Sequence, residues 1–307
     1  MSNFSHISVM LYETVDSLVT DPDGIYVDCT TGGAGHSREI LSRLSENGRL
    51  IAIDQDPDAI AVIKERIGSD KRVTIVHDNF SNLKAILTSL GIEEVNGIMA
   101  DLGGSSYQLD EGSRGFSYNY DFPLDMRMSK EGMTAADVVN TYSERDLTRI
   151  LRDYGEEKFA SRIARSIVQH RQNKPIETTL EFSEIIKSAM PAAAKRDGHP
   201  ARRTFQAIRI FTNKELDGLG NAVHDMFDCL KKGGRVSVIT FHSLEDRTVK
   251  QEFAALAKGC TCPKNFPVCV CGKTPSAKVL KAVAPGAGEL SDNIRSRSAR
   301  LRTAEKL

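Results

Sequence analysis

The first hundred residues alternate short apolar runs with amphipathic segments whose apolar positions recur every three or four residues. The apolar runs predict strands, and the amphipathic segments predict helices. Because strand–helix alternation with short connections is typical of parallel sheets, we expect a sheet covered by helices on both faces. The predicted strands are residues 24–28, 49–54, 72–77 and 97–101, and the predicted helices are residues 37–47, 57–67 and 83–90.

The pattern changes after residue 101. A stretch without a clear period is followed by helical segments with no strand between them, and the α/β pattern returns only late in the chain. We therefore expect an α/β fold in which a helical segment is inserted into a Rossmann-like sheet. The aperiodic stretch is 103–133, the helical segments are 135–168 and 180–194, and the late elements are a helix at 221–230, a Lys-Lys-Gly-Gly stop at 231–234 and a strand at 235–241.

These changes predict a core that is interrupted once. Residues 1–108 are expected to form the first part of the core. Residues 109–205 are expected to form a mostly helical insert whose role is substrate recognition. Residues 206–307 complete the core and carry a cysteine-rich loop and a basic tail.

Composition places the chain among ordinary globular proteins, with 40% hydrophobic and 27% charged residues. No apolar run approaches the roughly 18–20 residues that are needed to cross a membrane. The N-terminus lacks the basic start and the apolar stretch of a signal peptide. We therefore expect a cytoplasmic protein without a membrane partner.

The net charge is zero, but two segments are locally basic. Residues 195–209 carry five basic side chains against Asp197, and the tail from residue 294 carries five against Glu305. Basic surfaces of this kind can hold phosphates even in a neutral protein. The alternative is that these side chains are solvated helix faces and a frayed tail.

The strongest local motif is the segment 28–36, DCTTGGAGH, which follows a predicted strand and opens a predicted helix. Glycines allow a ligand to approach the backbone, and a helix N-terminus offers N–H groups that have no partner within the helix. Asp54 ends the second predicted strand, where an acid can bind ribose hydroxyls. The loop lacks the third glycine of a dinucleotide fingerprint, and a tight turn without a ligand is the alternative interpretation.

Two further residues follow strands of the same predicted sheet. Phe80 comes after the third strand, where an aromatic ring can pack against an adenine, although a single phenylalanine is more often part of the core. Asp101 ends the fourth strand, so it is expected at the edge of the sheet where ligands of open α/β sheets bind. The alternative is that Asp101 only caps the next turn.

Longer strings give the sequence a specific resemblance. It resembles the 16S ribosomal RNA (cytosine-N4)-methyltransferase family, also called RsmH or MraW, nearly from end to end and in the expected order. The strings that carry the resemblance are residues 6–11, 28–37, 52–54, 101–108, 114–117, 123–128, 154–157, 199–206 and 241–247.

The resemblance implies an S-adenosylmethionine-dependent methyltransferase that modifies a cytosine of 16S ribosomal RNA in the decoding centre of the small subunit. The family often has another residue at the position of Gly104, a difference that we expect to affect loop flexibility. The S-adenosylmethionine contacts that the resemblance implies are Ala34, Gly35, His36, Asp54, Phe80, Asp101 and Gln108.

Methylation of the cytosine amino group needs alignment of the reacting atoms and an acceptor for a proton or a hydrogen bond from N4. Asp101 is our hypothesis for that acceptor. Asp125 is a second acid that could reach the site, and an ion pair with Arg127 is its alternative role. An aromatic ring is expected to stack on the base, and the sequence does not decide among Tyr107, Phe116, Tyr118 and Phe122.

Four of the six cysteines lie in the pattern Cys260-x-Cys262 and Cys269-x-Cys271. Closely spaced thiolates in a cytosolic protein suit a tetrahedral structural zinc, which the methyl transfer itself does not need. A cysteine-rich loop without metal is the alternative, and both remain open. Cys29 and Cys229 are expected to be small buried residues.

Two other functional classes compete with this interpretation. A glycine loop followed by an acid also suits a nicotinamide-dependent oxidoreductase, and the basic segments also suit an RNA-binding module without catalysis. The expected partner is 16S ribosomal RNA, either free or in the small subunit. The sequence leaves the oligomeric state open, a dimer included.

Overall fold

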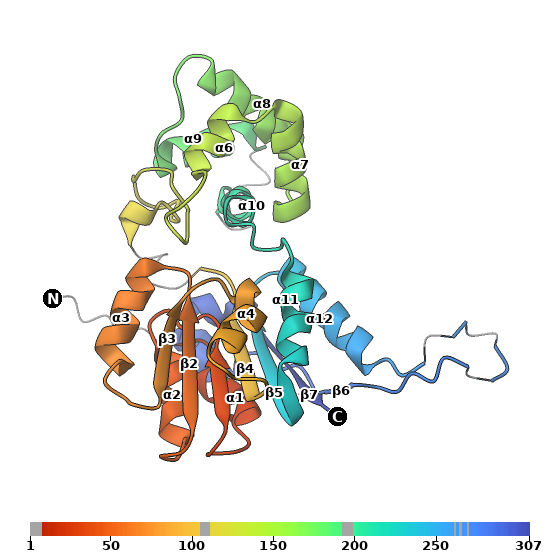
Figure 1. Cartoon of the computed structure of the whole chain (residues 1–307). Helices are drawn as coiled ribbons and strands as arrows, with labels where there is room; N and C mark the ends of the chain where they lie inside the picture. The colour runs from red at the N-terminus through yellow and green to blue at the C-terminus, as the bar shows by residue number, and fades with distance from the viewer. Residues whose placement is uncertain (1–7, 105–110, 192–198, 261, 264–265, 269) are drawn as a thin grey trace. The chain divides into compact units, whose positions relative to one another are not determined.

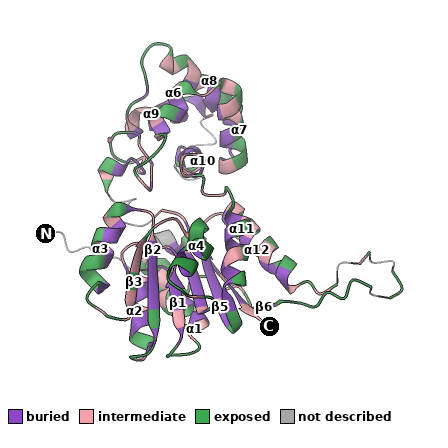
Figure 2. Cartoon of the chain, viewed as in Figure 1, coloured by how far each residue is buried: buried purple, intermediate pink, exposed green. Residues whose placement is uncertain are grey.

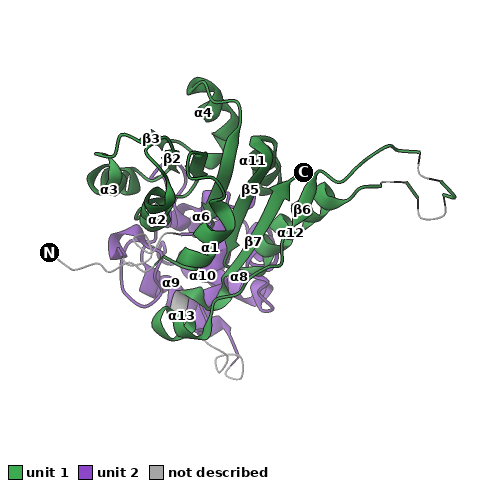
Figure 3. Ribbon diagram, turned by 90° about the horizontal axis from the view of Figure 1, so that it is seen from below, with its two compact units in different colours: residues 1–103, 218–307 green, residues 104–217 purple. Residues whose placement is uncertain are grey.

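The fold is described from a computed structural model, which defines residues 8–104, 111–191, 199–260, 262–263, 266–268 and 270–307. The chain forms two compact units (Figure 3). The first comprises residues 1–103 and 218–307, and the second comprises residues 104–217. The chain therefore leaves the first unit once and returns to it.

A seven-stranded sheet in the order β3-β2-β1-β4-β5-β7-β6 forms the centre of the first unit (Figure 1). Strands β1 to β5 are parallel, whereas β7 is antiparallel to both β5 and β6. The order 3-2-1-4-5 is that of a Rossmann-like sheet, which confirms the predicted fold class. The strands are β1 (Ile25–Asp28), β2 (Arg49–Asp54), β3 (Val73–His77), β4 (Val95–Asp101), β5 (Leu230–Thr240), β6 (Ala277–Val279) and β7 (Arg300–Lys306).

Helices cover this sheet, and the central strands are buried on both faces (Figure 2). Helices α1, α2 and α3 share one apolar cluster with Tyr26, Leu50 and Met99 of the strands. This burial explains why apolar runs, rather than alternating patterns, mark β2 and β4 in the sequence. The helices of this unit are α1 (Leu11–Leu18), α2 (Gly35–Arg43), α3 (Pro57–Ile67), α4 (Leu83–Ser89), α11 (Leu219–Asp228), α12 (Ser243–Ala257) and α13 (Ala287–Asp292), with 3-10 turns η1 (Phe80–Asn82) and η4 (Ile294–Ser298).

The stop predicted at residues 231–234 is wrong, because these residues lie within β5. The pairing of β5 with β4 skips from Val95↔Leu230 to Gly97↔Arg235, so the two lysines and two glycines form a bulge. Gly233 has a φ of 79°, a conformation that glycine adopts without a steric cost.

The alternative interpretation of the C-terminal tail as frayed is also wrong. Residues 300–306 form β7, which lies between β5 and β6 and has Leu301 and Ala304 buried. Its polar positions conceal it from a search for apolar runs.

The second unit is built from helices around its own apolar core, which confirms the predicted helical insert. The predicted boundary at 205/206 falls within α10, which is continuous, and the unit extends to Asp217. Its elements are η2 (Gly112–Arg114), α6 (Ala135–Thr141), α7 (Glu144–Gly155), α8 (Ala160–Arg171), α9 (Thr179–Ala189) and α10 (Arg202–Asn213). In the described part of the chain, no helix has the length and apolar character that a membrane span requires.

Candidate active site

The loop between β1 and α2 is the centre of the candidate site. Ala34 has a φ of 62° and Gly32 a φ of 51°, so the backbone turns sharply before the helix begins. The Thr31 hydroxyl and the Thr31 N–H both donate to the carbonyl of Ile53, which ties the loop to the end of β2. Helix α2 has no side-chain cap and no acid in its first turn, so its N-terminus suits an anionic group of a ligand.

Gly35 is required by close packing rather than by its backbone angles. A Cβ atom at this position would lie 1.8 Å from the Ser8 hydroxyl oxygen. The segment containing Ser8 is held over α2 because the Nε2 of His36 lies 3.0 Å from the carbonyl oxygen of Val9. A carbonyl only accepts, so this ring nitrogen carries the proton. The start of α2 and residues 8–10 therefore form one packed wall.

Replacing Gly35 with alanine is expected to displace this wall and to weaken S-adenosylmethionine binding. Overpacking of this kind costs about 1–3 kcal/mol, which corresponds to a loss of roughly 5- to 150-fold if it falls on the bound form. Titration calorimetry measures the loss. Adding Ser8→Gly removes the clashing hydroxyl and is expected to restore most of the affinity. A double variant that binds as weakly as Gly35→Ala would contradict this explanation.

Asp54 joins the glycine loop to the end of β2. Its Oδ2 accepts the N–H of Gly32 at 2.7 Å, and its Oδ1 accepts the N–H of Asp56 at 2.9 Å. Burial raises the pKa of Asp54 above its usual value. The backbone of Gln55 also hydrogen-bonds to Asp54. A carboxylate has about four acceptor positions, so Asp54 can hold the loop and still accept from the ribose.

Phe80 begins η1, directly after β3. The side chain of Asn79 caps this turn by accepting the N–H of Ser81 at 2.9 Å. Phe80 is half-buried and is not one of the buried core residues. Phe80 is therefore partly exposed at the same end of the sheet as Asp54.

Asp101 ends β4, and its N–H donates to the Thr30 hydroxyl at 2.6 Å. Its Oδ2 lies 3.9 Å from Nδ1 of His36. Its Oδ1 is buried and has no hydrogen-bond partner among the described residues. Burial, together with the charges of Asp28, Glu245 and Glu289, raises the pKa of Asp101 well above 3.8. An unpaired buried oxygen is costly, and such groups recur at functional sites.

Asp28 completes a group of three acids at the ends of neighbouring strands. It is buried, it accepts the Ser37 hydroxyl at 2.7 Å, and burial raises its pKa from 3.8 to about 6. The charge of Asp54 adds to the rise in Asp28, as the charge of Asp28 does in Asp101. Acids that repel one another in this way favour a ligand that brings positive charge.

The raised pKa of Asp28 has a consequence for stability. Between about pH 4 and pH 6, the folded chain keeps a proton that the unfolded chain has lost, so stability falls as the pH rises. For a shift of this size the loss is on the order of 3 kcal/mol. Asp28→Asn removes the titration while keeping an acceptor for Ser37. We expect this variant to gain stability relative to the parent chain as the pH rises through this window.

Urea denaturation of both proteins at several pH values tests this expectation. Asp153→Asn serves as the control, because Asp153 is exposed on α7. The difference between parent and control should stay constant with pH. A constant difference between parent and Asp28→Asn would contradict the buried, protonated state of Asp28.

Comparison with known proteins identifies the family. The model of the MraW methylase family matches residues 3–307. The chain belongs to the MraW methylase family. This membership confirms the resemblance and the expected methyltransferase activity that depends on S-adenosylmethionine. It contradicts the nicotinamide-dependent oxidoreductase and the RNA-binding module without catalysis.

Close relatives of this MraW-family chain are named "Ribosomal RNA small subunit methyltransferase H". The protein of Clostridium botulinum (strain Kyoto / Type A2) is 57% identical and is covered over 99% of both chains. That of Lachnospira eligens is 55% identical, over 99% of this chain and 98% of the relative. A solved putative rRNA-methylase from Clostridium thermocellum is 13% identical, with a TM-score of 0.45, over 98% of this chain and 99% of that chain.

In this MraW-family chain, one end of a single sheet brings together most of the predicted cofactor residues. Gln108 and Tyr107 lie outside the described residues. Ser8, Thr30 and Glu289 were not predicted as site residues, although Ser8 lies in the string 6–11 and Thr30 in the motif 28–36. Glu289 accepts the N–H of Met10 at 2.7 Å across 279 positions of sequence, and no local pattern indicates such a contact. The predicted cofactor residues that the structure places at this end are Ala34, Gly35, His36, Asp54, Phe80 and Asp101.

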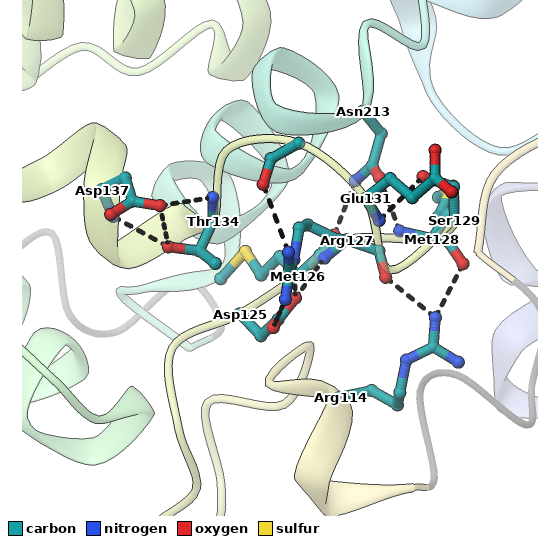
Figure 4. Close-up of polar contacts among 11 residues, drawn as sticks. Arg114, Asp125, Met126, Arg127, Met128, Ser129, Glu131, Thr134, Asp137 and Asn213 are labelled. Atoms are coloured by element: carbon teal, nitrogen blue, oxygen red, sulfur yellow. Dashed lines mark hydrogen bonds and ion pairs between the residues drawn. The ribbon is translucent and has the colours of Figure 1, made fainter.

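Asp125 is engaged elsewhere in the MraW-family chain. Figure 4 shows its carboxylate held by Arg127, with contacts of 2.9 Å to Nε and 2.7 Å to the terminal nitrogen. Partial burial alone would raise the pKa of Asp125, but the hydrogen bonds from Arg127 lower it overall. The ion pair with Arg127, which was its alternative role, is therefore confirmed.

The structure also narrows the choice of stacking aromatic. Phe116 is only 7% exposed and belongs to the core of the helical unit. Tyr118 already stacks on His199, with ring centroids 4.3 Å apart. Phe122 is half-buried. Phe116 and Tyr118 are therefore engaged within the helical unit, and Phe122 stays a candidate for stacking on the base.

Proposed function

We propose that this chain methylates the exocyclic N4 of a cytosine in the RNA of the small ribosomal subunit. The names of its relatives support the RNA class, and the resemblance to the cytosine-N4 family supports the atom. The proposed chemistry rests on one observation. The Oδ1 of Asp101, beside the glycine loop at the end of β4, is buried and has no hydrogen-bond partner within the described part of the chain. A methyl donor and a base must meet at such an acceptor.

The residues at the ends of β1, β2 and β3 fit S-adenosylmethionine. Asp54 would accept the ribose hydroxyls, the exposed part of Phe80 would pack against the adenine, and the uncapped N-terminus of α2 would receive the carboxylate. When bound, S-adenosylmethionine supplies a transferable methyl on a positively charged sulfonium. The three acids fit that charge, because a nearby cation relieves their mutual repulsion.

Asp101 would act on the target amino group. The lone pair of N4 is delocalised into the cytosine ring, so N4 is a weak nucleophile and becomes more acidic as a bond to carbon forms. A carboxylate that accepts its hydrogen bond stabilises this developing charge and can take the proton. The raised pKa of Asp101 suits the role, because a carboxylate with a raised pKa is a stronger base toward the N4 proton.

Recognition of the RNA would belong to the helical unit. Arg202 and Arg203 are exposed in the first turn of α10, whereas Arg209 is held by Glu215 through two contacts of 2.9 Å. In the basic tail, Arg302 is paired with Asp246, and Lys306 donates to backbone carbonyls. The basic segment around α10 is therefore a better candidate for phosphate contact than the tail.

The target base must leave its stack, or be single-stranded already, before its amino group can be reached. The decoding centre as the location of the cytosine, and the cytoplasm as the compartment, belong to this proposal as well.

Calorimetric titrations with S-adenosylmethionine and with NAD test the cofactor assignment directly. We expect binding of S-adenosylmethionine and none of NAD. Transfer of labelled methyl groups to naked 16S RNA and to assembled small subunits then identifies the substrate form. Binding of RNA without binding of S-adenosylmethionine would contradict the proposal.

A further inference from the structure

The segment between α12 and β6 has a fixed base and no apolar core. At the base, the N–H and the hydroxyl of Ser276 both donate to the carbonyl of Leu256, at 3.0 and 2.9 Å. Figure 1 shows the described residues of this segment extending away from the sheet beyond α12 and β6. None of the described residues from 257 to 276 is buried. A loop of this length without a core needs another source of order.

Three cysteine sulfurs converge inside this loop. The Sγ atoms of Cys260, Cys262 and Cys271 all lie within 4.8 Å of one another. Zinc with Zn–S bonds of about 2.3 Å in a tetrahedral arrangement places its sulfurs about 3.8 Å apart. The Sγ atoms of Cys260 and Cys271 are 3.8 Å apart. This separation is far longer than a disulfide bond, and the described cysteines form none.

Backbone groups support the same arrangement. The N–H of Cys262 donates to the Sγ of Cys260, and the N–H of Val270 donates to the Sγ of Cys262, both at 3.4 Å. Hydrogen bonds to ligand atoms orient metal sites and stabilise the negative charge of thiolates. The loop is also rich in lysine and contains no acid between Glu252 and Glu289, so nearby positive charge offsets that of a metal–thiolate group.

We propose that Cys260, Cys262 and Cys271 bind a structural zinc ion that fixes the loop between α12 and β6. The sulfur ligands and their spacing favour zinc over magnesium or calcium, which prefer oxygen. Structural zinc has four ligands, and the sequence offers Cys269 as the fourth, which lies outside the described residues. The site is separate from the acids at the ends of β1, β2 and β4, and the proposal does not depend on the methyl-transfer chemistry.

Elemental analysis of the full chain, purified under reducing conditions without chelator, tests the proposal. We expect about one zinc per chain, and loss of most of it in Cys260→Ser and in Cys271→Ser. Cys229→Ser is the matched control, because Cys229 is a buried residue at the end of α11 and should leave the zinc content unchanged. Circular dichroism shows whether each variant retains the folded sheet.

Limited trypsin digestion gives a second readout that is independent of activity. Lys258 and Lys273 flank the cysteines and are exposed, so chelator should speed cleavage there by at least tenfold, and added zinc should restore protection. A folded, metal-free chain with reactive thiols would overturn the proposal. So would iron in place of zinc, a disulfide between Cys260 and Cys271, or zinc retained in both serine variants.

Discussion

Replacing Asp101 with asparagine is expected to lower turnover at saturating S-adenosylmethionine by about 10²- to 10⁴-fold, the usual contribution of a general base. Asparagine keeps the shape of the side chain but cannot take a proton. Affinity for RNA should change little, because Asp101 would contact one base of a large footprint. Measuring turnover under saturation separates this effect from any loss of cofactor affinity.

The pH dependence gives the second part of this test. Because the pKa of Asp101 is raised, turnover of the parent chain should increase with pH as the carboxyl loses its proton. Asp101→Asn should lose this limb of the profile. Asp125→Asn should keep it, since Asp125 is held by Arg127. Near-normal saturated turnover in Asp101→Asn, with weak cofactor binding, would contradict this role and would make Asp101 a binding residue only.

Replacing Asp54 with alanine is expected to weaken S-adenosylmethionine binding by tenfold or more. Charge-assisted hydrogen bonds are worth about 1.5–3 kcal/mol each, and the variant loses those to the ribose. It also leaves the N–H groups of Gly32 and Asp56 without their acceptor, so the glycine loop loosens. Calorimetry on the folded variant measures the combined loss. Unchanged affinity would contradict the assignment.

A modified ligand separates the two roles of Asp54. S-Adenosylhomocysteine and its 2′,3′-dideoxy analogue differ only in the ribose hydroxyls. If Asp54 binds those hydroxyls, the parent chain should prefer the natural ligand strongly, and Asp54→Ala should bind both about equally. Asp58→Asn removes an equal charge in the first turn of α3 and should keep the preference. An equal loss for both ligands in Asp54→Ala would show that Asp54 acts only through the loop.

The first four strands could be predicted from the sequence because each is a short apolar run bounded by turn residues. Strands buried on both faces have this signature, and β2 and β4 are buried over most of their length. The later strands lack this simple sequence pattern. The glycines at 233 and 234 indicate a stop, but they form a bulge within β5. Strand β7 mixes charged and apolar residues and buries Leu301 and Ala304, so no apolar run marks it in the sequence.

Some residues of the candidate site could be predicted from the sequence, and others could not. Asp54, Phe80 and Asp101 follow strands of a parallel sheet, so their common edge could be predicted from topology. The wall formed by Ser8 and Val9 could not be predicted, because residues far apart in sequence meet there only after folding. The pKa of Asp28 depends on how deeply three acids are buried together, and local sequence does not encode that burial.

The measurement that tests the central claim most directly is mass spectrometry of nucleosides from methylated ribosomal RNA. Small subunits that lack the modification are incubated with the chain and with S-adenosylmethionine carrying an isotopically labelled methyl group, and their 16S RNA is digested to nucleosides. The account predicts that the label appears in N4-methylcytidine at one position of the RNA, and that Asp101→Asn reduces it in step with turnover. Label in another nucleoside, or none while S-adenosylmethionine binds, would contradict it.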